Sequence, residues 1–112
     1  MSLTADDDAS SSRPVALHDL VLTPARRSVV VRGAAVSTTR MEFQLLYLLA
    51  SNPGIVFRRE RLIAKLGRGE VFVSPRSIDA VVRRLRKKIE VDPASPLLLL
   101  TVWGDGYKFA DL

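Results

Sequence analysis

The chain has 112 residues, of which 47% are hydrophobic, so it is long enough for one domain with a modest core and is not disordered overall. Lys and Arg number 17 against 12 acids, and the first dozen residues hold three Asp and no cation, so the rest of the chain carries +8. Such a basic domain indicates a polyanionic partner, either nucleic acid or an anionic membrane surface.

Arginine accounts for 13 of the 17 cations, and its planar donor fork suits phosphates and guanine edges. This composition favours nucleic acid over a membrane. Cysteine is absent, which excludes a disulfide framework and a Cys-based zinc site and fits the reducing cytoplasm. Apolar runs such as Leu97 to Leu100 are too short to span a bilayer. We therefore expect a cytoplasmic domain that needs no cofactor and no membrane.

The first 13 residues are rich in Ser, Asp and Ala without periodicity, which predicts a disordered leader or linker. Residues 1–3 resemble a start added by cloning, and residues 14–112 are predicted to form one domain. Between residues 15 and 36, β-favouring runs at 20–22 and 28–32 are broken by Thr23-Pro24 and Arg32-Gly33. This pattern predicts a small antiparallel meander that serves as scaffold.

Two apolar helices are predicted next. Thr39 and Glu42 have the spacing of a capping box, and the helix behind them ends near Asn52-Pro53-Gly54. A second, shorter helix is expected over residues 59–66 and ends at Gly67-Arg68-Gly69. Arg58 precedes it in the capping position, although Arg cannot cap a helix N-terminus.

A third helix, over residues 76–90, is strongly amphipathic and follows Ser74-Pro75 as N-cap and first residue. Its apolar stripe is formed by Ile78, Val82, Leu85 and Ile89. The opposite face carries Arg76, Ala80, Arg83 and Lys87, with Arg84 beside them. A helix with one buried face and one cationic face is typical of a major-groove reader, and two helices joined by a turn follow the helix-turn-helix plan. The alternative is a solvated basic face.

The C-terminal segment alternates strand and turn: residues 97–102, then Gly104-Asp105-Gly106, then residues 107–109. This predicts a β-hairpin next to the third helix, the position of a wing. The glycine-rich turn lacks the strand-loop-helix context and the Lys of a phosphate-binding loop. His18 has no acidic or Cys partner at metal-ligand spacing, and we interpret it as an ordinary strand residue. No spacing of Ser, His and Asp suggests a nucleophile, so the chain is not expected to be an enzyme.

These pieces together resemble the winged-helix effector domain of OmpR/PhoB-type bacterial response regulators, which is an α+β fold. The resemblance runs from about Leu17 to Phe109. It is carried by Glu42-Phe43-x-Leu45-Leu46, Pro53-Gly54-x-Val56, Arg59-Glu60-x-Leu62, Arg76-Ser77-Ile78-Asp79 with Arg83-Arg84-Leu85-Arg86-Lys87-Lys88, and Thr101-Val102-x-Gly104-x-Gly106-Tyr107-x-Phe109. It implies sequence-specific binding of double-stranded DNA in two-component signalling, with this third helix in the major groove and the wing on the adjacent minor groove or backbone.

The resemblance also implies site residues. The DNA-binding set is Arg76, Ser77, Asp79, Ala80, Arg83, Arg84, Arg86, Lys87, Trp103 and Lys108. The loop between residues 67 and 73, with Arg68 and Glu70, matches the segment through which relatives contact RNA polymerase. Tandem or homodimeric binding to direct repeats is expected as well.

Several positions leave alternatives open. Trp103 stands where the family usually carries an Arg that enters the minor groove, and it either packs on the third helix or lies on the sugar-phosphate backbone. Asp79 either accepts from a cytosine amine or orients Arg83 through an i,i+4 pair, and we favour the second role. At the level of the whole domain, the rivals are a winged helix that docks an acidic protein and a regulatory appendage of an enzyme.

Overall fold

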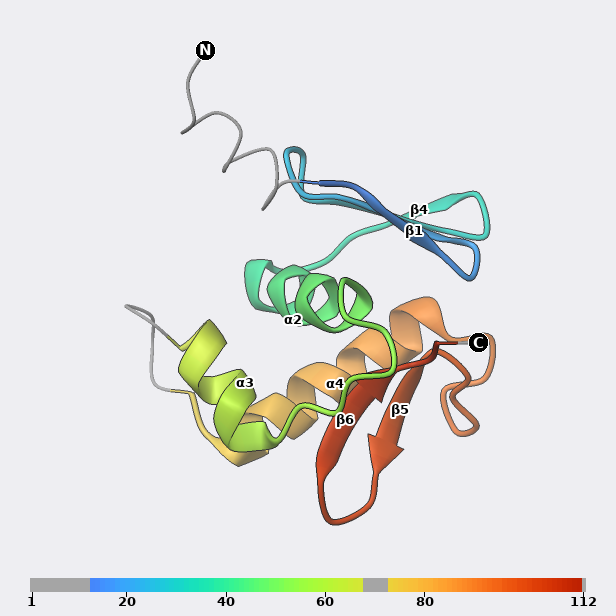
Figure 1. Cartoon of the computed structure of the whole chain (residues 1–112). Coiled ribbons are helices and arrows are strands. Elements are labelled where there is room, and N and C mark those ends of the chain that lie inside the picture. Colours follow the sequence, from blue (N-terminus) through green and yellow to red (C-terminus); the bar gives the residue numbers. More distant parts are fainter. Residues whose placement is uncertain (1–12, 68–72, 112) are drawn as a thin grey trace. The chain divides into compact units, whose positions relative to one another are not determined.

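The computed structural model describes residues 13–67 and 73–111 of the chain, shown in Figure 1. The chain divides into two compact units, Met1–Ser37 and Thr38–Leu112. The predicted leader covers residues 1–13, and all of it except Arg13 lies outside the described residues.

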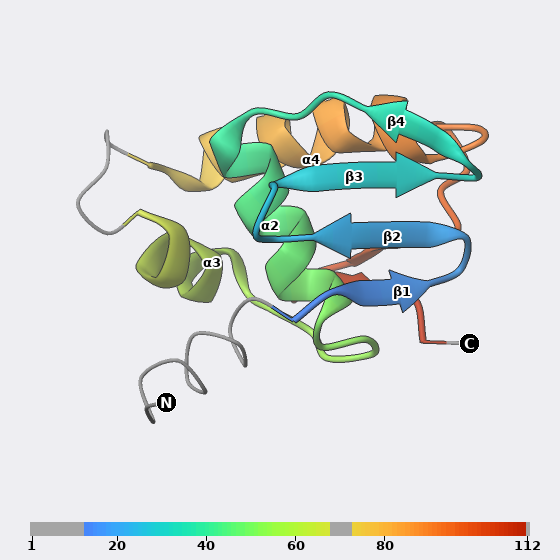
Figure 2. The same ribbon diagram turned by 90° about the horizontal axis from the view of Figure 1, so that it is seen from above.

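The first unit contains a four-stranded antiparallel sheet in the order β1-β2-β3-β4, seen face-on in Figure 2. Its strands are β1 Val15–Leu17, β2 Leu20–Thr23, β3 Ser28–Val31 and β4 Ala34–Val36. The predicted meander is confirmed, and two short strands flank the two runs recognised in the sequence. His18 does not lie in a strand, because it occupies the turn between β1 and β2 with a φ of 52°. The interpretation of His18 as a strand residue was therefore wrong.

The second unit contains three helices, α2 Arg40–Ala50, α3 Arg59–Leu66 and α4 Pro75–Ile89, which pack against one another. The capping box of α2 forms as predicted: the Glu42 amide donates to Thr39 Oγ1 at 3.1 Å, and the Thr39 amide donates to Glu42 Oε1 at 2.9 Å. Arg58 occupies the N-cap of α3 without a side-chain capping bond. Ser74 caps α4, and Pro75 opens the helix, where its missing N–H costs nothing.

The buried face of α4 anchors this unit. Ile78, Leu85 and Ile89 have no exposed surface, and Val82 is 1% exposed, so the predicted apolar stripe is confirmed. Val81 is also buried, which makes the apolar face wider than the stripe read from the sequence. Because the buried residues run along the whole length of α4, packing fixes the orientation of the helix and therefore of its opposite, exposed face.

The wing is a hairpin of β5 Leu99–Val102 and β6 Gly106–Phe109, with Leu100 opposite Lys108. The loop between α2 and α3 extends it, which the sequence did not indicate. The Phe57 amide donates to the Tyr107 carbonyl at 2.8 Å, and the Tyr107 amide donates back at 3.0 Å. Gly106 is needed at this contact because a Cβ there would lie 2.1 Å from the Phe57 carbonyl oxygen. Backbone hydrogen bonds thus join the wing to the loop between α2 and α3.

Candidate nucleic-acid interface

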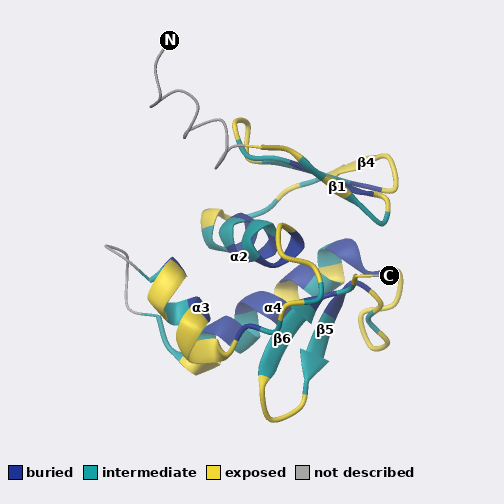
Figure 3. Ribbon diagram, in the orientation of Figure 1, coloured by how far each residue is buried: buried dark blue, intermediate teal, exposed yellow. Residues whose placement is uncertain are grey.

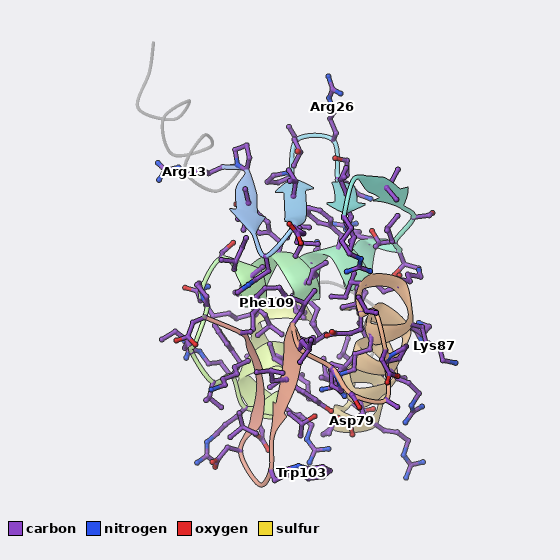
Figure 4. All side chains as sticks on the ribbon, turned by 90° about the vertical axis from the view of Figure 1, so that its right-hand side faces the viewer. Arg13, Arg26, Asp79, Lys87, Trp103 and Phe109 are labelled. Atoms are coloured by element: carbon purple, nitrogen blue, oxygen red, sulfur yellow. The ribbon has the colours of Figure 1, made fainter. Side chains whose placement is uncertain are left out.

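One face of α4 carries exposed cations. Arg76, Arg83 and Lys87 are exposed, and with Ala80 they recur every three to four residues, so they share one helix face. We call these four residues the cationic stripe. Among the residues that the structure describes, none of the three cations forms an ion pair. Figure 3 shows the exposed segments of α4, and Figure 4 shows Lys87 pointing away from the helices.

Two further cations of α4 are bound to the start of α2 instead. Glu42 is 1% exposed, and its carboxylate accepts from Arg84 Nε at 2.9 Å and from Lys88 Nζ at 2.6 Å. Burial by itself would raise the pKa of Glu42, but bonds from Lys88, the Thr39 amide and Arg84, with the charge of Lys88, outweigh burial and lower that pKa. The Arg84 side chain remains 52% exposed, so its outer nitrogens stay available to solvent or DNA.

This buried carboxylate predicts a pH dependence of stability. A depressed folded-state pKa stabilises the fold above the unfolded-state value near 4.5, and the contribution is lost as the pH falls below it. Glu42→Gln keeps an acceptor for the Thr39 amide but removes the charge that holds Arg84 and Lys88. We expect it to lower the free energy of unfolding at pH 7 by about 1–3 kcal/mol. Urea unfolding at pH 7 and at pH 3 should show a smaller difference between variant and wild type at pH 3. An equal difference at both pH values would contradict this role of Glu42.

Asp79 connects three elements of the domain. It accepts from Arg59 Nη1 of α3 at 2.9 Å and from the Tyr107 hydroxyl of β6 at 2.6 Å. Burial, the bond to Asp79 and the charge of Asp79 raise the pKa of Tyr107 to about 12, so the hydroxyl remains a donor at neutral pH. The favoured prediction, that Asp79 orients Arg83, is wrong: its ion pair is with Arg59. Asp79 holds α3 and the wing against α4.

Arg86 makes a second connection between α4 and the wing. Its Nε donates to the Leu99 carbonyl at 2.9 Å, and its Nη2 donates to Thr101 Oγ1 at 2.8 Å. Its guanidinium also lies over the Tyr107 ring, 5.8 Å from the centroid. Arg86 thus positions the wing, and its predicted contact with a phosphate stays a prediction.

Glu90, which shows no functional signal in the sequence, fixes the connection from α4 to β5. Glu90 is 6% exposed, and its carboxylate accepts from the amides of Leu97, Leu98 and Leu99, the shortest at 2.8 Å. A charged residue directly after an amphipathic helix is common. The sequence therefore does not indicate that the backbone amides of residues 97–99 donate to it. The effect is that the start of the wing is tied to the end of α4.

Other predicted site residues differ in their availability. Ser77 uses its hydroxyl in the α4 cap, where it accepts from the Ser74 amide and donates to the Ser74 carbonyl, both at 2.8 Å. Lys108 lies half-buried on β6. Trp103 is 89% exposed at the wing tip, which excludes the alternative that it packs on α4 (Figure 4). Arg68 and Glu70, predicted to contact RNA polymerase, lie outside the described residues.

Three helices, a β-hairpin hydrogen-bonded to the loop between α2 and α3, and an exposed cationic helix face define a winged helix-turn-helix domain. The family described as "Transcriptional regulatory protein, C terminal" matches residues 33–109. The chain therefore belongs to this family, which is the OmpR/PhoB-type class that the sequence resembles.

Known proteins of this class are similar over nearly the whole chain. An uncharacterized transcriptional regulatory protein of Bacillus subtilis, YcbL, is 36% identical over 94% of this chain and 46% of its own length. The response regulator DrrB of Thermotoga maritima, an OmpR/PhoB homologue, has a TM-score of 0.82 at 34% identity, covering 97% of this chain and 51% of DrrB. The DNA-binding domain of Klebsiella pneumoniae RstA, solved with the RstA box, has a TM-score of 0.77 at 30% identity, covering 88% of this chain and 97% of that domain. The chain thus spans about half the length of YcbL and DrrB.

Within residues 13–67 and 73–111, no helix has both the length and the apolar character needed to cross a membrane. The same residues contain no group of His, Cys, Asp or Glu side chains placed to hold a metal ion.

Proposed function

We propose that this domain binds double-stranded DNA sequence-specifically as part of a bacterial transcriptional regulator, with α4 in the major groove and the wing beside it. The observation that carries the proposal is the cationic stripe, which is unpaired within the described residues and lies opposite a fully buried helix face. An α-helix fits the major groove, and Arg forks match its guanine acceptors. The RstA domain, which has the same fold, was solved with its DNA box.

The side chains of the interface divide by task. Arg83, near the middle of α4, is assigned to base edges, while Arg76 and Lys87 near its two ends are assigned to phosphates. Ala80 is small enough to leave room for a thymine methyl. Arg84 is expected to contact DNA through the nitrogens that Glu42 leaves free. Lys108 and Trp103 are assigned to the wing contact.

The wider role of the protein follows from its relatives. We propose that the full protein acts in the cytoplasm in two-component transcription control and is not an enzyme. RNA polymerase contact through residues 67–73 and tandem or homodimeric binding to direct repeats are further parts of this proposal. These proposals are supported by the similarity of this chain to YcbL and DrrB, two regulators that are about twice as long as this chain.

Selection of bound duplexes from a random DNA pool at near-physiological salt tests the proposal. We expect a recovered motif, repeated at helical-turn spacing if two copies bind in tandem. Binding without enrichment that disappears as salt rises would mean that only the sequence-independent phosphate attraction is present. That outcome would contradict sequence-specific recognition and favour docking of an acidic protein on the same face.

Lys87→Ala tests the phosphate contact at the end of α4. We expect it to weaken binding to all duplexes alike and to reduce the slope of log K against log salt by about one unit. Lys65→Ala is the matched control, because Lys65 is exposed in the last turn of α3 and is not part of the stripe. Fluorescence anisotropy over a salt series measures both variants. A slope for Lys87→Ala equal to that of the control would remove Lys87 from the interface.

A further inference from the structure

Glu42 places a buried negative charge against α4. Only two charged residues are buried in the described part of the chain, and the other, Glu90, is satisfied by backbone amides. Glu42 also completes the capping box of α2, but a Gln at this position serves that purpose equally well. The cap therefore does not explain why the residue is charged. The partners of the charge are two side chains of α4.

Both oxygens of this carboxylate are held in place. Oε1 accepts from the Thr39 amide at 2.9 Å and from Lys88 Nζ at 2.6 Å, and Oε2 accepts from Arg84 Nε at 2.9 Å. Because Glu42 is buried, these bonds are stronger than they would be in contact with water. Glu42 therefore offers Arg84 a charged acceptor whose position is fixed by the fold.

This bond constrains the direction of the Arg84 guanidinium. The group is planar, and Nε is its nitrogen closest to the helix, so a bond at Nε leaves the two terminal nitrogens as a pair on the outer side. Within the described residues, neither terminal nitrogen donates a hydrogen bond. Arg83 is exposed without an ion pair in the same part of the chain, so its rotamers are not restricted in this way. Two adjacent arginines thus differ in how far they are ordered before binding.

The Glu42 carboxylate affects base reading and phosphate attraction in opposite directions. A bidentate bond to the O6 and N7 acceptors of guanine requires two donors at the correct angle. A side chain that is already ordered loses less conformational entropy when it forms that bond. Attraction to phosphates requires only charge, and the carboxylate offsets one positive charge of α4. Glu42 should therefore strengthen specific binding and weaken sequence-independent binding.

We propose that Glu42 is a positioning residue that sets the sequence specificity of this domain without touching DNA. It holds the Arg84 guanidinium so that the two terminal nitrogens face a guanine edge in the major groove. This inference rests on the proposed function, since it concerns how α4 reads DNA. Lys88, which binds the other oxygen, serves to balance the buried charge.

Glu42→Gln tests this role, because Gln keeps the volume and the cap but not the charge. The probes are a duplex recovered by selection and its scrambled version, measured by anisotropy of end-labelled DNA. We expect the affinity for the selected duplex to fall about five-fold, while the affinity for the scrambled duplex is unchanged or rises. Duplexes changed one base pair at a time should show that the preference for one guanine falls to the level of Arg84→Ala.

Lys88→Met is the matched control, because it removes the other side chain that is bonded to Glu42 and keeps an apolar stem. We expect it to weaken binding to both duplexes alike and to leave the preference for guanine unchanged. In the Arg84→Ala background, Glu42→Gln should cause no further loss of this preference. Circular dichroism verifies that each variant is folded at the temperature of the titrations.

Order in the wild-type protein provides a measurement that does not depend on a variant. In the absence of DNA, we expect the ¹⁵N order parameter of Arg84 Nε to be close to that of a rigid backbone amide, about 0.85. The order parameter of Arg83 Nε should be below about 0.6. An Arg84 Nε as mobile as that of Arg83 would overturn the inference, because Glu42 would then not hold the side chain.

Three binding results would also overturn it while leaving the proposed function intact. The first is equal loss of affinity for both duplexes, or an unchanged guanine preference, in Glu42→Gln. The second is the same loss of guanine preference in Lys88→Met. The third is a further loss of preference from Glu42→Gln in the Arg84→Ala background, because Glu42 would then act through another residue. A wild-type chain that binds both duplexes equally would overturn the inference and the proposed function together.

Discussion

Gly106→Ala should lower the free energy of unfolding of the second unit by about 2–4 kcal/mol. Gly106 has a φ of 137°, which side-chain-bearing residues rarely adopt, and a Cβ there would lie 2.1 Å from the Phe57 carbonyl oxygen and 2.9 Å from Arg58 Cα. Backbone atoms cannot move aside as a flexible side chain can. The pairing of Phe57 with Tyr107 must therefore open, and the wing loses these two hydrogen bonds to the loop before α3.

Gly104→Ala is the matched control for this substitution. Gly104 lies two residues earlier in the same turn with a φ of 84°, but nothing lies within 4 Å of its Cβ position. Only the cost of the left-handed backbone remains, about 1–2 kcal/mol. Urea denaturation followed by circular dichroism compares the two variants. Equal losses of stability at both positions would show that the contact with Phe57 does not constrain the wing.

Arg83→Ala should lower specific DNA affinity by about 1–3 kcal/mol and relax discrimination at one base pair. Arg83 is exposed in the middle of α4, and within the described residues it has no ion-pair partner. Its removal should leave the stability of the domain within about 0.5 kcal/mol of wild type. Anisotropy titrations against duplexes changed one base pair at a time locate the position that Arg83 reads. An unchanged pattern of preference would assign Arg83 to the solvated face of the helix.

Arg84→Ala provides an informative contrast. We expect it to reduce specific affinity by about 1–3 kcal/mol as well, because its outer nitrogens are placed to contact DNA. Because Arg84 also bonds to the buried Glu42, this substitution should lower the free energy of unfolding as well. We expect Arg83→Ala to lose binding at unchanged stability and Arg84→Ala to lose both. This difference would distinguish a side chain that only contacts DNA from one that also supports the fold.

The fold could be predicted from local sequence signals that the structure confirms. Capping residues and proline set the starts of α2 and α4, and the spacing of Ile78, Val82, Leu85 and Ile89 fixed which side of α4 is buried. These features act over one to four residues, so they are visible in a single sequence. The same periodicity placed Arg76, Arg83 and Lys87 on one exposed face.

The long-range bonds of the site could not be predicted in this way. Arg86 and Asp79 lie on a helix rich in charge, where nothing local separates a side chain that binds DNA from one that binds the wing. Their partners are 15 and 28 residues away, at Thr101 and Tyr107. The bond from Arg84 to Glu42 spans 42 residues. Each requires knowledge of how the hairpin and α2 pack on α4, which the pattern of one helix does not contain.

These bonds also explain why the cations of α4 are not equivalent. Arg84, Arg86 and Lys88 hold α2 and the wing in place, while Arg76, Arg83 and Lys87 remain free of ion pairs within the described part of the chain. Because α4 is held at several points, the backbone positions of Arg76, Arg83 and Lys87 are fixed before binding. This reduces the conformational entropy that is lost on binding.

The ratio of affinities for the selected duplex and for its scrambled version tests the central claim most directly. Both are measured by anisotropy with the wild-type chain at near-physiological salt. Specific readout by α4 predicts a ratio of about 10³ or more, the range in which specific protein–DNA complexes exceed nonspecific ones. A ratio near one, with both affinities falling equally as salt rises, would show that the cationic stripe attracts DNA without reading it.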